Sequence, residues 1–519
     1  MSETRADVVV VGGGHNGLVA AAYLARAGRR VVVCEARDRF GGAVAGDAVF
    51  PGVPARLSRF SYLVSLLPQQ LVDDLGLELR LRSRAVASYS PYERDGRADG
   101  LLVERPEGEA TRRSFATRTG DQAEHRRWQE FHDRIGTLAA AIAPTLTGPL
   151  PRAAELADRV DPELWSLVTE RPLGELVEGT FADDLVRGTV FTDALIGTES
   201  GAHDPTLRQN RCFLYHVVGR GTGEWAVPLG GMGAVADALV AAARRSGAEL
   251  RERAAVTALD GDGRRWRVVL ADGDTVVAPT VLLNCADAVT DRLLGLEPDD
   301  VPEGNQLKIN MLLRRLPALA SGIDPRVAFA GTLHVGQGYR RLAEAHALAT
   351  AGALPDPLPC EVYCHTLTDP TILAPELVAQ GWQTLTLFGL HTPAGLFRAD
   401  PDGARDRAVR AALEGLQAVL AEPLEDCLAR DPEGRPCLEA MSPLDVEAEL
   451  GMPGGHIFHG DLSWPWLDDD EPAGSAAERW GVATDHPGLL RCGSSSRRGG
   501  AVSALGGHSA AMAVLEAAG

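Results

Sequence analysis

The sequence almost completely lacks lysine. Lys308 is the single lysine among 51 lysine and arginine residues, and it stands in the stretch QLKINML, which has the pattern of a buried strand. Such an arginine bias is typical of a GC-rich coding sequence, which exchanges equivalent surface lysines for arginines. A lysine kept inside a strand indicates a task for a compact ammonium group that a planar guanidinium performs poorly.

Excess positive charge and long apolar runs are also missing. The net charge of −20 disfavours a nucleic-acid partner and electrostatic attachment to a membrane, because both depend on cationic side chains. No apolar run approaches the roughly 20 residues that a membrane-spanning helix needs. The start, MSETRADVVVVGGG, lacks the basic region and cleavage site of a signal peptide. These absences predict a cytoplasmic protein without a transmembrane segment.

Clustered metal ligands and redox cysteines are absent as well. The eight cysteines form no CxxC pair, and Cys360 and Cys364 alternate with their neighbours as small core residues of a strand do. The 13 histidines form no HExxH motif. This usage fits a reducing compartment and predicts no metal site.

The N-terminus has the pattern of a strand, a glycine turn, a helix and a second strand. The run DVVVVG at 7–12 is β-branched, GGGHNG follows, and LVAAAYLARAG predicts a helix before the strand RVVVCE. Gly12 permits the sharp turn, and Gly14 lets a pyrophosphate approach the backbone. Gly17 lets helix and strand pack closely, and Glu35 accepts ribose hydroxyls. The unit predicts dinucleotide binding, and its acid disfavours NADP.

The residues that follow carry a family resemblance. The stretch EARDRFGG at 35–42 resembles the FAD motif of the flavin-containing amine oxidase and phytoene desaturase superfamily, in which an R-x-G-G turn follows the acid. Amine oxidases commonly have an arginine after the two glycines, whereas this chain has Ala43, as the desaturase-like branch does. The resemblance implies FAD as the cofactor. The cofactor-binding residues expected in this part are Gly12, Gly14, Asn16, Gly17, Glu35, Ala36, Arg37, Gly41, Gly42 and Ala43.

The resemblance continues along the chain. Residues 248–288 resemble the return of the chain into the FAD-binding domain. Residues 492–508 align without gaps with the CGSGTHPGGGVTGAPGH run of a branch that includes the pyridine nucleotide-disulfide oxidoreductase domain proteins. That branch implies a helix that begins at Val502 and Ser503 and turns its backbone N–H groups toward the flavin. The further cofactor-binding residues that it implies are Ser61, Tyr62, Val256, Ala286, Gly493, Ser494, Val502 and Ser503.

Several positions depart from this branch. Its His-Pro pair is replaced by Arg497 and Arg498, and its usual IPS stretch by YCHT at 363–366. Because such departures fall on the substrate side, we expect a substrate other than the usual one of the family. The two arginines either meet an anionic substrate group or lie in a solvated loop. His456 and His459, in GGHIFHGDLSW, either orient substrate or have a structural role.

Lys308 has a counterpart in the family. In the flavin amine oxidases, a lysine in the corresponding strand holds a water against flavin N5, and the desaturase-like branch tends to have KIN or KVN here. The resemblance therefore implies that Lys308 is a catalytic residue that tunes flavin reactivity at N5. The alternative is a strand lysine whose ammonium group reaches solvent.

We expect an α/β protein with a Rossmann-like FAD-binding domain, a mixed-sheet substrate domain and a helical lid. The amphipathic face of the lid is expected to pack on the body of the protein, with contact to a membrane as the alternative. The oligomeric state is left open. The expected boundaries are 1–70, 218–300 and 470–519 for the FAD-binding domain, 71–115 and 301–469 for the substrate domain, and 116–217 for the lid.

The function that the resemblance implies is hydride transfer between flavin N5 and a carbon of a small lipophilic substrate. Desaturation or reductive cyclisation of a polyene in bacterial specialised metabolism would suit the branch. NAD(P)H is left open as a transient electron donor, because no second GxGxxG unit is present to hold it. One alternative is an oxygen-using amine oxidase, which Lys308 favours and which Ala43 and the absence of a recognisable aromatic cage disfavour. Another is a non-redox flavin-binding isomerase or a structural FAD protein.

Overall fold

A five-stranded parallel sheet forms one end of the molecule in the computed structural model, which describes residues 3–518. Its strand order is β10-β3-β2-β14-β20, and every pairing in it is parallel. Three distant parts of the chain therefore meet in one layer. The strands are β2 (Val8–Val11), β3 (Val31–Cys34), β10 (Glu249–Arg251), β14 (Thr280–Leu283) and β20 (Leu489–Arg491).

Both faces of this sheet are covered, which explains its valine-rich strands. Val8 and Val10 belong to the core shared with three helices, whereas Val9 and Val11 belong to the core shared with an antiparallel sheet. The alternation follows from the two-residue period of a strand. The helices are α1 (His15–Arg26), α10 (Gly231–Arg245) and α18 (Leu505–Ala517), and the second sheet contains β1 (Glu3–Arg5), β13 (Thr275–Ala278), β12 (Trp266–Leu270) and β11 (Val256–Gly261) in that order.

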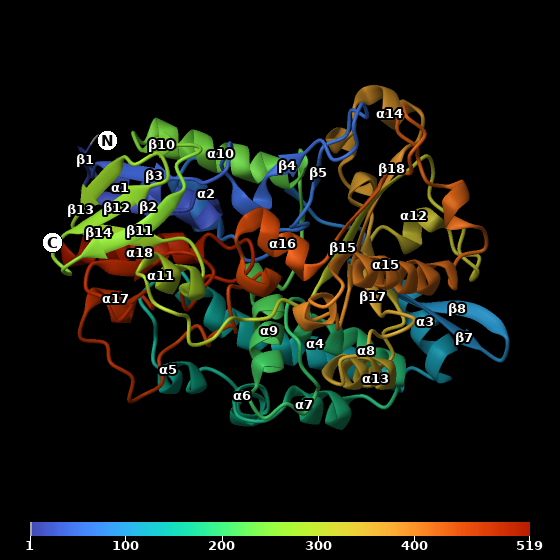
Figure 1. The fold of residues 1–519 in the computed structure, drawn as a ribbon. Coiled ribbons are helices and arrows are strands. Elements are labelled where there is room, and N and C mark those ends of the chain that lie inside the picture. The colour runs from blue at the N-terminus through green and yellow to red at the C-terminus, as the bar shows by residue number, and fades with distance from the viewer. Residues whose placement is uncertain (1–2, 519) are drawn as a thin grey trace.

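A seven-stranded mixed sheet forms the other end of the molecule (Figure 1). Every residue of its strand β15 is buried, and Lys308 on that strand pairs with Phe388 and Met441 on its two neighbours. Helices α12 (Pro325–Ala328) and α15 (Pro401–Gln417) share its core. The strands, in spatial order, are β19 (Leu438–Met441), β15 (Leu307–Leu313), β18 (Gln383–Gly389), β17 (Cys360–Tyr363), β16 (Thr332–Val335), β7 (Val86–Arg94) and β8 (Arg97–Glu104).

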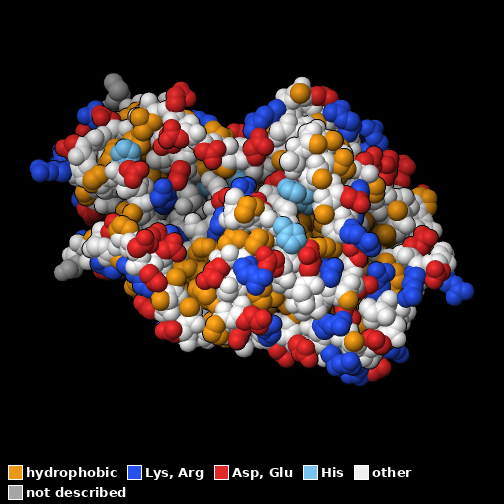
Figure 2. Space-filling view, turned by 90° about the horizontal axis from the view of Figure 1, so that it is seen from below, with side chains coloured by type: hydrophobic (Ala, Val, Ile, Leu, Met, Phe, Trp, Pro, Cys, Tyr) orange, Lys and Arg blue, Asp and Glu red, His pale blue; other side chains and the backbone are white. Residues whose placement is uncertain are grey.

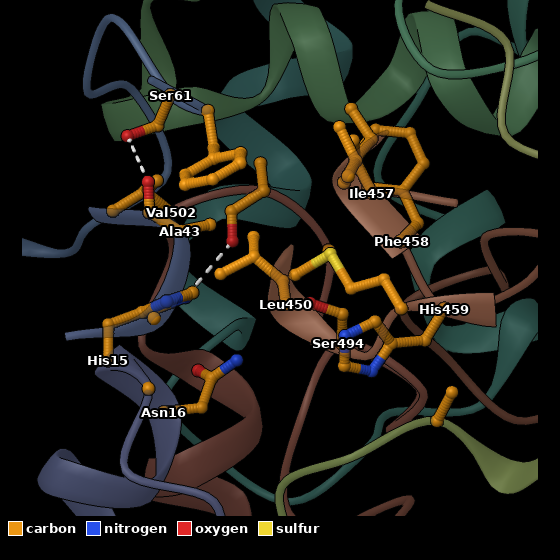
Figure 3. Close-up of a pocket in the computed structure, with 18 of the residues that line it drawn as sticks. His15, Asn16, Ala43, Ser61, Leu450, Ile457, Phe458, His459, Ser494 and Val502 are labelled. Atoms are coloured by element: carbon orange, nitrogen blue, oxygen red, sulfur yellow. Dashed lines mark hydrogen bonds between the residues drawn. The ribbon is translucent and has the colours of Figure 1, made fainter. Parts of the chain in front are cut away.

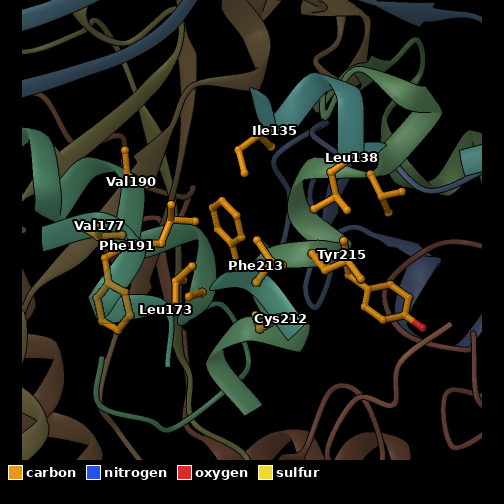
Figure 4. Close-up of a cluster of buried hydrophobic side chains, with 14 of the residues drawn as sticks. Ile135, Leu138, Leu173, Val177, Val190, Phe191, Cys212, Phe213 and Tyr215 are labelled. Atoms are coloured by element: carbon orange, nitrogen blue, oxygen red, sulfur yellow. The ribbon is translucent and has the colours of Figure 1, made fainter. Parts of the chain in front are cut away.

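A helical layer lies along the lower side of Figure 1, below both sheets. Its helices pack on a common apolar core, part of which Figure 4 shows around Phe213 and Leu138. Helix α13 (Tyr339–Thr350) packs on α8 of this layer. The layer contains α3 (Glu109–Thr119), α4 (Ala123–Ile142), α5 (Ala153–Ala157), α6 (Pro162–Thr169), α7 (Leu173–Thr180), α8 (Asp184–Phe191) and α9 (Arg208–Val217).

The predicted fold class is confirmed: the fold is α/β, with one wholly parallel sheet, one mixed sheet and a helical layer. Among the described residues, no helix has both the length and the apolar character needed to cross a bilayer. Viewed from the helical side, the surface intersperses acidic and basic side chains (Figure 2). The remaining short elements include α2 (Gln69–Asp74), β4 (Gly46–Asp47), β5 (Leu57–Ser58), β6 (Leu81–Arg82), β9 (Val227–Pro228), α11 (Asp287–Leu293), α14 (Pro375–Ala379), α16 (Pro443–Leu450) and α17 (Ala476–Arg479).

Candidate active site

A cavity of about 330 Å³ has walls from both large sheets and from the helical layer. The parallel sheet contributes the turn after β2 and the ends of β3 and β14, while the seven-stranded sheet contributes Lys308 and Phe388. The helical layer contributes Ile196 and residues of α9. Segments that are hundreds of residues apart therefore line one space.

The glycine turn at the start of α1 is as tight as the sequence predicts. Gly12 has a φ of +98°, a backbone conformation that residues with a Cβ rarely adopt. A Cβ on Gly17 would lie 2.4 Å from the carbonyl oxygen of Gly12, so only glycine fits between the helix and the turn. Asn284 closes the turn from β14, because its side-chain amide donates to the same carbonyl at 2.9 Å.

The N-terminus of α1 is open to an anion. No side chain caps this helix, and its first turn carries no acidic residue. Gly14, His15 and Asn16 line the cavity at this end. The unpaired backbone N–H groups and the helix dipole favour a phosphate here.

Glu35 lies at the end of β3 with its carboxylate held in place. One carboxylate oxygen accepts a hydrogen bond from the backbone N–H of Gly13 at 2.7 Å, and the other accepts one from the backbone N–H of Arg37 at 2.9 Å. Each oxygen has a second lone pair that can accept a ribose hydroxyl. The buried Nη1 atom of Arg37, which also lines the cavity, has no hydrogen-bond partner among the described residues. These groups fit the sugar and phosphates of a dinucleotide.

Segments near the N-terminus meet the C-terminal loop in one wall of the cavity (Figure 3). The hydroxyl of Ser61 donates to the carbonyl oxygen of Ala43 at 2.9 Å, and the ring of His15 contacts the carbonyl oxygen of Ala501 at 3.2 Å. Ala501 has a φ of +55°, and helix α18 begins only at Leu505. The prediction that this helix begins at Val502 and Ser503 is therefore wrong, because left-handed residues delay it.

Lys308 is buried at the cavity wall, with 4% of its surface exposed. Its ammonium group donates to the carbonyl oxygens of Ser58 at 2.8 Å and Ser61 at 2.9 Å, and it lies 5.3 Å from the centre of the Phe388 ring. Burial lowers the pKa of Lys308 to about 7, although the nearby Glu439 raises it. The alternative of a head group in solvent is therefore wrong.

Aromatic side chains gather beside Lys308. The rings of Tyr62 and Trp225 are parallel, with centroids 6.1 Å apart, and Tyr62 lies 4.5 Å from Phe388 and 4.8 Å from Tyr363. Local sequence does not indicate this group, because its four members come from four separate segments of the chain. An aromatic cage was not recognisable in the sequence, whereas the structure places four aromatic rings beside Lys308.

A buried acid lies behind these rings. The hydroxyl of Tyr363 donates to the carboxylate of Glu361, and Thr192 donates to the same carboxylate at 3.4 Å. Burial raises the pKa of Glu361 to about 8, and burial raises the pKa of the neighbouring Asp193 to about 7. Burial also raises the pKa of Tyr62, whose ring lies 4.8 Å from that of Tyr363. Behind the rings, the chain thus holds two carboxyl groups whose raised pKa favours the neutral form, and neither lines the cavity.

The two arginines of the C-terminal loop have neither of the expected roles. Arg498 is 1% exposed, and its guanidinium donates to the carbonyl oxygens of Leu146, Gly148, Pro149 and Pro465. Arg497 donates to Glu471 and to the carbonyl oxygen of Trp466. Neither lines the cavity or lies in a solvated loop. Arg498 instead joins the C-terminal loop to the helical layer.

The two histidines of 454–464 differ in role. His456 has a structural role, because its ring accepts hydrogen bonds from the backbone N–H groups of Phe458 and Gly460. His459 lines the cavity with a φ of +63°, and its buried Nδ1 has no hydrogen-bond partner among the described residues.

Most residues that the sequence singled out share this cavity. Gly17, Gly41, Gly493 and Ser503 do not line it; Gly17 packs against Gly12, Gly41 donates to Gly13, Gly493 packs against Asn284, and Ser503 accepts from the backbone of Leu505. The predicted residues that line the cavity are Gly12, Gly14, Asn16, Glu35, Ala36, Arg37, Gly42, Ala43, Ser61, Tyr62, Val256, Ala286, Lys308, Ser494 and Val502.

Other lining residues were not predicted. His15 lies inside the glycine motif and Phe60 precedes Ser61, so their neighbours in sequence could have pointed to them. Trp225, Gln306 and Phe388 reach the cavity only through the fold of the chain, and nothing in their local sequence indicates it.

Comparison with protein families and with known proteins found a matching family model and several similar proteins. The family model for flavin-containing amine oxidoreductases matches residues 17–289. An uncharacterized protein of Mycobacterium tuberculosis is 48% identical over 521 residues, covering 98% of this chain and 97% of its own length. Pyridine nucleotide-disulfide oxidoreductase domain-containing protein 2 of Mus musculus is 29% identical over 565 residues, covering 98% and 93%.

Two further comparisons concern a desaturase and a solved structure. Hydroxyneurosporene desaturase of Cereibacter sphaeroides is 31% identical over 323 residues, which covers 58% of this chain and 61% of that protein. A structure of putrescine oxidase bound to putrescine superposes with a TM-score of 0.56 at 18% identity, covering 99% of this chain and 100% of that one. At this identity the likeness concerns the fold.

Proposed function

The chain belongs to the flavin-containing amine oxidoreductase family and is an FAD-dependent oxidoreductase, and on that premise we propose that it exchanges hydride with a carbon of a small lipophilic substrate. FAD, when bound, supplies the group that accepts or gives the hydride. The protein binds and orients both partners, excludes water and moves protons. The three-part division into FAD-binding domain, substrate domain and lid at the expected boundaries is part of this proposal.

The observation that carries the substrate class is the lid-side wall of the cavity. This wall consists of residues from the core of the helical layer, among them Leu66, Ile196, Phe458 and Leu462. Within residues 3–518, the only carboxylate that lines the cavity is Glu35, at the dinucleotide end. An ammonium substrate would find no acid to pair with near the aromatic rings, whereas an apolar substrate gains from leaving water.

We assign the dinucleotide to the end of the cavity formed by Gly12, Gly14 and Glu35, and the reacting end to the neighbourhood of Tyr62 and Lys308. The uncapped N-terminus of α1 and the carboxylate of Glu35 support the first assignment. The second is supported by Lys308, whose ammonium group uses two donors on carbonyl oxygens and keeps a third for the cavity. In this proposal that third donor steadies a water or the cofactor edge.

Proton movement in this proposal follows the hydroxyls behind the cavity. Tyr62 lines the cavity, the ring of Tyr363 packs against the ring of Tyr62, and the hydroxyl of Tyr363 donates to Glu361. For Tyr62 to give a proton to a basic atom in the cavity, the Tyr363 hydroxyl turns from Glu361 to Tyr62 and gives its proton there, while the carboxyl group of neutral Glu361 gives its own proton to Tyr363. The direction reverses when the cavity must lose a proton.

Desaturation or reductive cyclisation of a polyene in bacterial specialised metabolism is the form of this chemistry that we favour. The partial likeness to a hydroxyneurosporene desaturase supports it, as does Ala43, which occupies the position of the arginine in amine oxidases. A second candidate, an oxygen-using amine oxidase, is favoured by the aromatic group around Tyr62 and Trp225. NAD(P)H as a transient donor belongs to the reductive variant of the proposal.

Anaerobic mixing separates these possibilities. FAD-loaded protein is mixed with polyenes, with amines and with NADPH, and the visible absorbance of the flavin is followed. Bleaching by a polyene with formation of a dehydrogenated product supports the proposal, and bleaching by NADPH supports its reductive form. Bleaching by an amine alone contradicts the proposal and favours the oxidase. Bleaching by none of the three leaves a structural or non-redox role for FAD.

A further inference from the structure

Three side chains with metal-binding atoms converge outside the cavity. Glu199 follows α8 in the helical layer, His346 lies on α13, and His391 follows strand β18 of the seven-stranded sheet. One ligand atom from each lies within 4.8 Å of the others. The sequence gives no hint of this group, because nearly two hundred positions separate its first and last members.

The three side chains are in contact, and both imidazoles turn a ring nitrogen toward the carboxylate. Nδ1 of His346 lies 2.7 Å from the Glu199 carboxylate, and Nδ1 of His391 lies 3.1 and 3.2 Å from its two oxygens. The His391 side chain is fully buried, whereas the side chains of Glu199 and His346 are 20% and 30% exposed. The group therefore has a closed side and a side that solvent reaches.

The charge of Glu199 has no permanent cation to balance it. Within residues 3–518, its ion-pair partners are these two histidines, and no arginine or lysine pairs with it. A carboxylate that is largely withdrawn from water is costly unless a positive charge lies against it. A bound divalent cation would supply that charge.

We propose that Glu199, His346 and His391 bind a divalent metal ion of the zinc class. Two imidazole nitrogens and one carboxylate oxygen are a donor set that zinc accepts, whereas calcium and magnesium prefer oxygen donors alone. Bonds of about 2.0–2.1 Å place the donor atoms of a tetrahedral site roughly 3.3 Å apart. The contacts of 2.7 to 3.2 Å need to open by about 0.6 Å or less. The solvent side leaves the fourth position to water.

The proposed metal ion lies between the helical layer and the seven-stranded sheet, next to segments that line the cavity. The side chain of Asn305 donates to the carbonyl oxygen of Thr198 at 3.1 Å and accepts from the backbone N–H of Thr392 at 2.7 Å, so the segments that carry Glu199 and His391 are already joined. Ile196 and Gln306, neighbours of these segments, line the cavity. A metal here fixes the helical layer against the seven-stranded sheet and has no part in hydride transfer.

Metal titration of the FAD-loaded protein tests the proposal. After treatment with a chelator, the protein is titrated with Zn²⁺ by calorimetry and with Co²⁺ by visible absorption, in wild type, E199Q, H346Q and the control H203Q. His203 forms a more exposed ion pair with Glu178 in the same layer, so its loss removes a comparable His–Glu contact. Unchanged flavin spectra and unfolding temperatures show that each metal-free variant is folded.

We expect one Zn²⁺ per wild-type and H203Q chain, and binding at least about 100-fold weaker in E199Q and H346Q, since even indirect metal contacts are worth 10–100-fold. Cobalt should give the intense bands of a tetrahedral site in the same two proteins. Absence of binding at micromolar Zn²⁺, or binding that E199Q and H346Q leave unchanged, would overturn the proposal. Neither result depends on whether the substrate is a polyene or an amine.

Discussion

The ammonium group of Lys308 donates a hydrogen bond to the carbonyl oxygen of Ser61 at 2.9 Å. This bond ties strand β15 of the seven-stranded sheet to the segment that leaves the parallel sheet, and the hydroxyl of Ser61 donates in turn to the carbonyl oxygen of Ala43. The only lysine of the chain thus lies where the two sheets meet at the cavity. The guanidinium of an arginine is larger and planar, so it would disturb these hydrogen bonds.

Replacement of Lys308 by arginine or methionine is expected to slow flavin reduction and reoxidation. Methionine removes the donor that faces the cavity and arginine displaces it, and we expect a rate loss of at least about tenfold, comparable with other single electrostatic contacts in active sites. Stopped-flow absorbance in FAD-loaded protein measures it. Wild-type rates in both variants would remove Lys308 from the catalytic residues.

The pH dependence of stability should report the burial of Lys308. Its folded-state pKa of about 7 lies below the ordinary value of 10.5, so between these values the unfolded chain binds more protons and the stability difference rises with pH. We expect the free energy of unfolding of wild type, relative to K308M, to increase by up to about 4 kcal/mol from pH 7 to pH 10.5. A flat difference measured by denaturant unfolding would mean that Lys308 stays charged.

Glu361 should control the alkaline side of the activity profile. With a pKa raised to about 8, it is a proton donor at neutral pH, and the rate of a step that needs its proton falls as pH rises through that value. We expect E361Q and Y363F to be roughly 10- to 100-fold slower and to lose this limb. Y89F, which changes a buried tyrosine bonded to Ser321 in the same sheet, is the control. Retention of the limb in E361Q would contradict the proton path.

The glycine turn allows a matched pair of substitutions. A side chain at Gly17 would collide with the carbonyl oxygen of Gly12, so G17V should abolish FAD binding. Gly136 lies in α4 with no atom near the position of a Cβ, so G136A should bind FAD normally and gain up to about 1 kcal/mol of stability. Flavin absorbance per chain after purification compares the two. Equal FAD content would contradict the placement of the dinucleotide at this turn.

Arg498 should stabilise the attachment of the helical layer. Its loss leaves buried carbonyl oxygens without donors, each worth about 1–3 kcal/mol, so R498M should lower the free energy of unfolding by about 3 kcal/mol or more. R497M should cost less, because Arg497 is more exposed. Hydrogen exchange in 143–150 should also speed up in R498M. Equal losses in both variants would show that Arg498 has no special role.

Local sequence predicted the parts of this protein whose chemistry depends on neighbouring residues. The turn from Gly12 to Gly17 and the acid at Glu35 follow from short-range spacing, because a strand, a turn and a helix fix their own geometry. The helix start at Leu505 was missed because Ala501 and Ala504 have a left-handed backbone conformation. Alanine rarely adopts this conformation, so the sequence does not indicate it.

The remaining parts of the site depend on pairing between distant strands. Phe388 meets Lys308 through the register of β15 and β18, and Tyr363 of β17 meets Tyr62 of the loop that follows β5. Arg498 was expected at the substrate or in solvent because an arginine in a glycine-rich loop is usually exposed. Its burial depends on a ring of carbonyl oxygens from 146–149 and 465 that no local pattern encodes.

The most direct measurement is an experimental structure of the FAD-loaded protein with the substrate side of the cavity resolved. We expect the ribose next to the adenine to contact Glu35, the phosphates to lie at the N-terminus of α1, and the isoalloxazine ring to lie beside Lys308 and Tyr62. An FAD molecule bound with its ring away from Lys308, or a cavity closed by side chains, would contradict the assignment of this cavity as the active site.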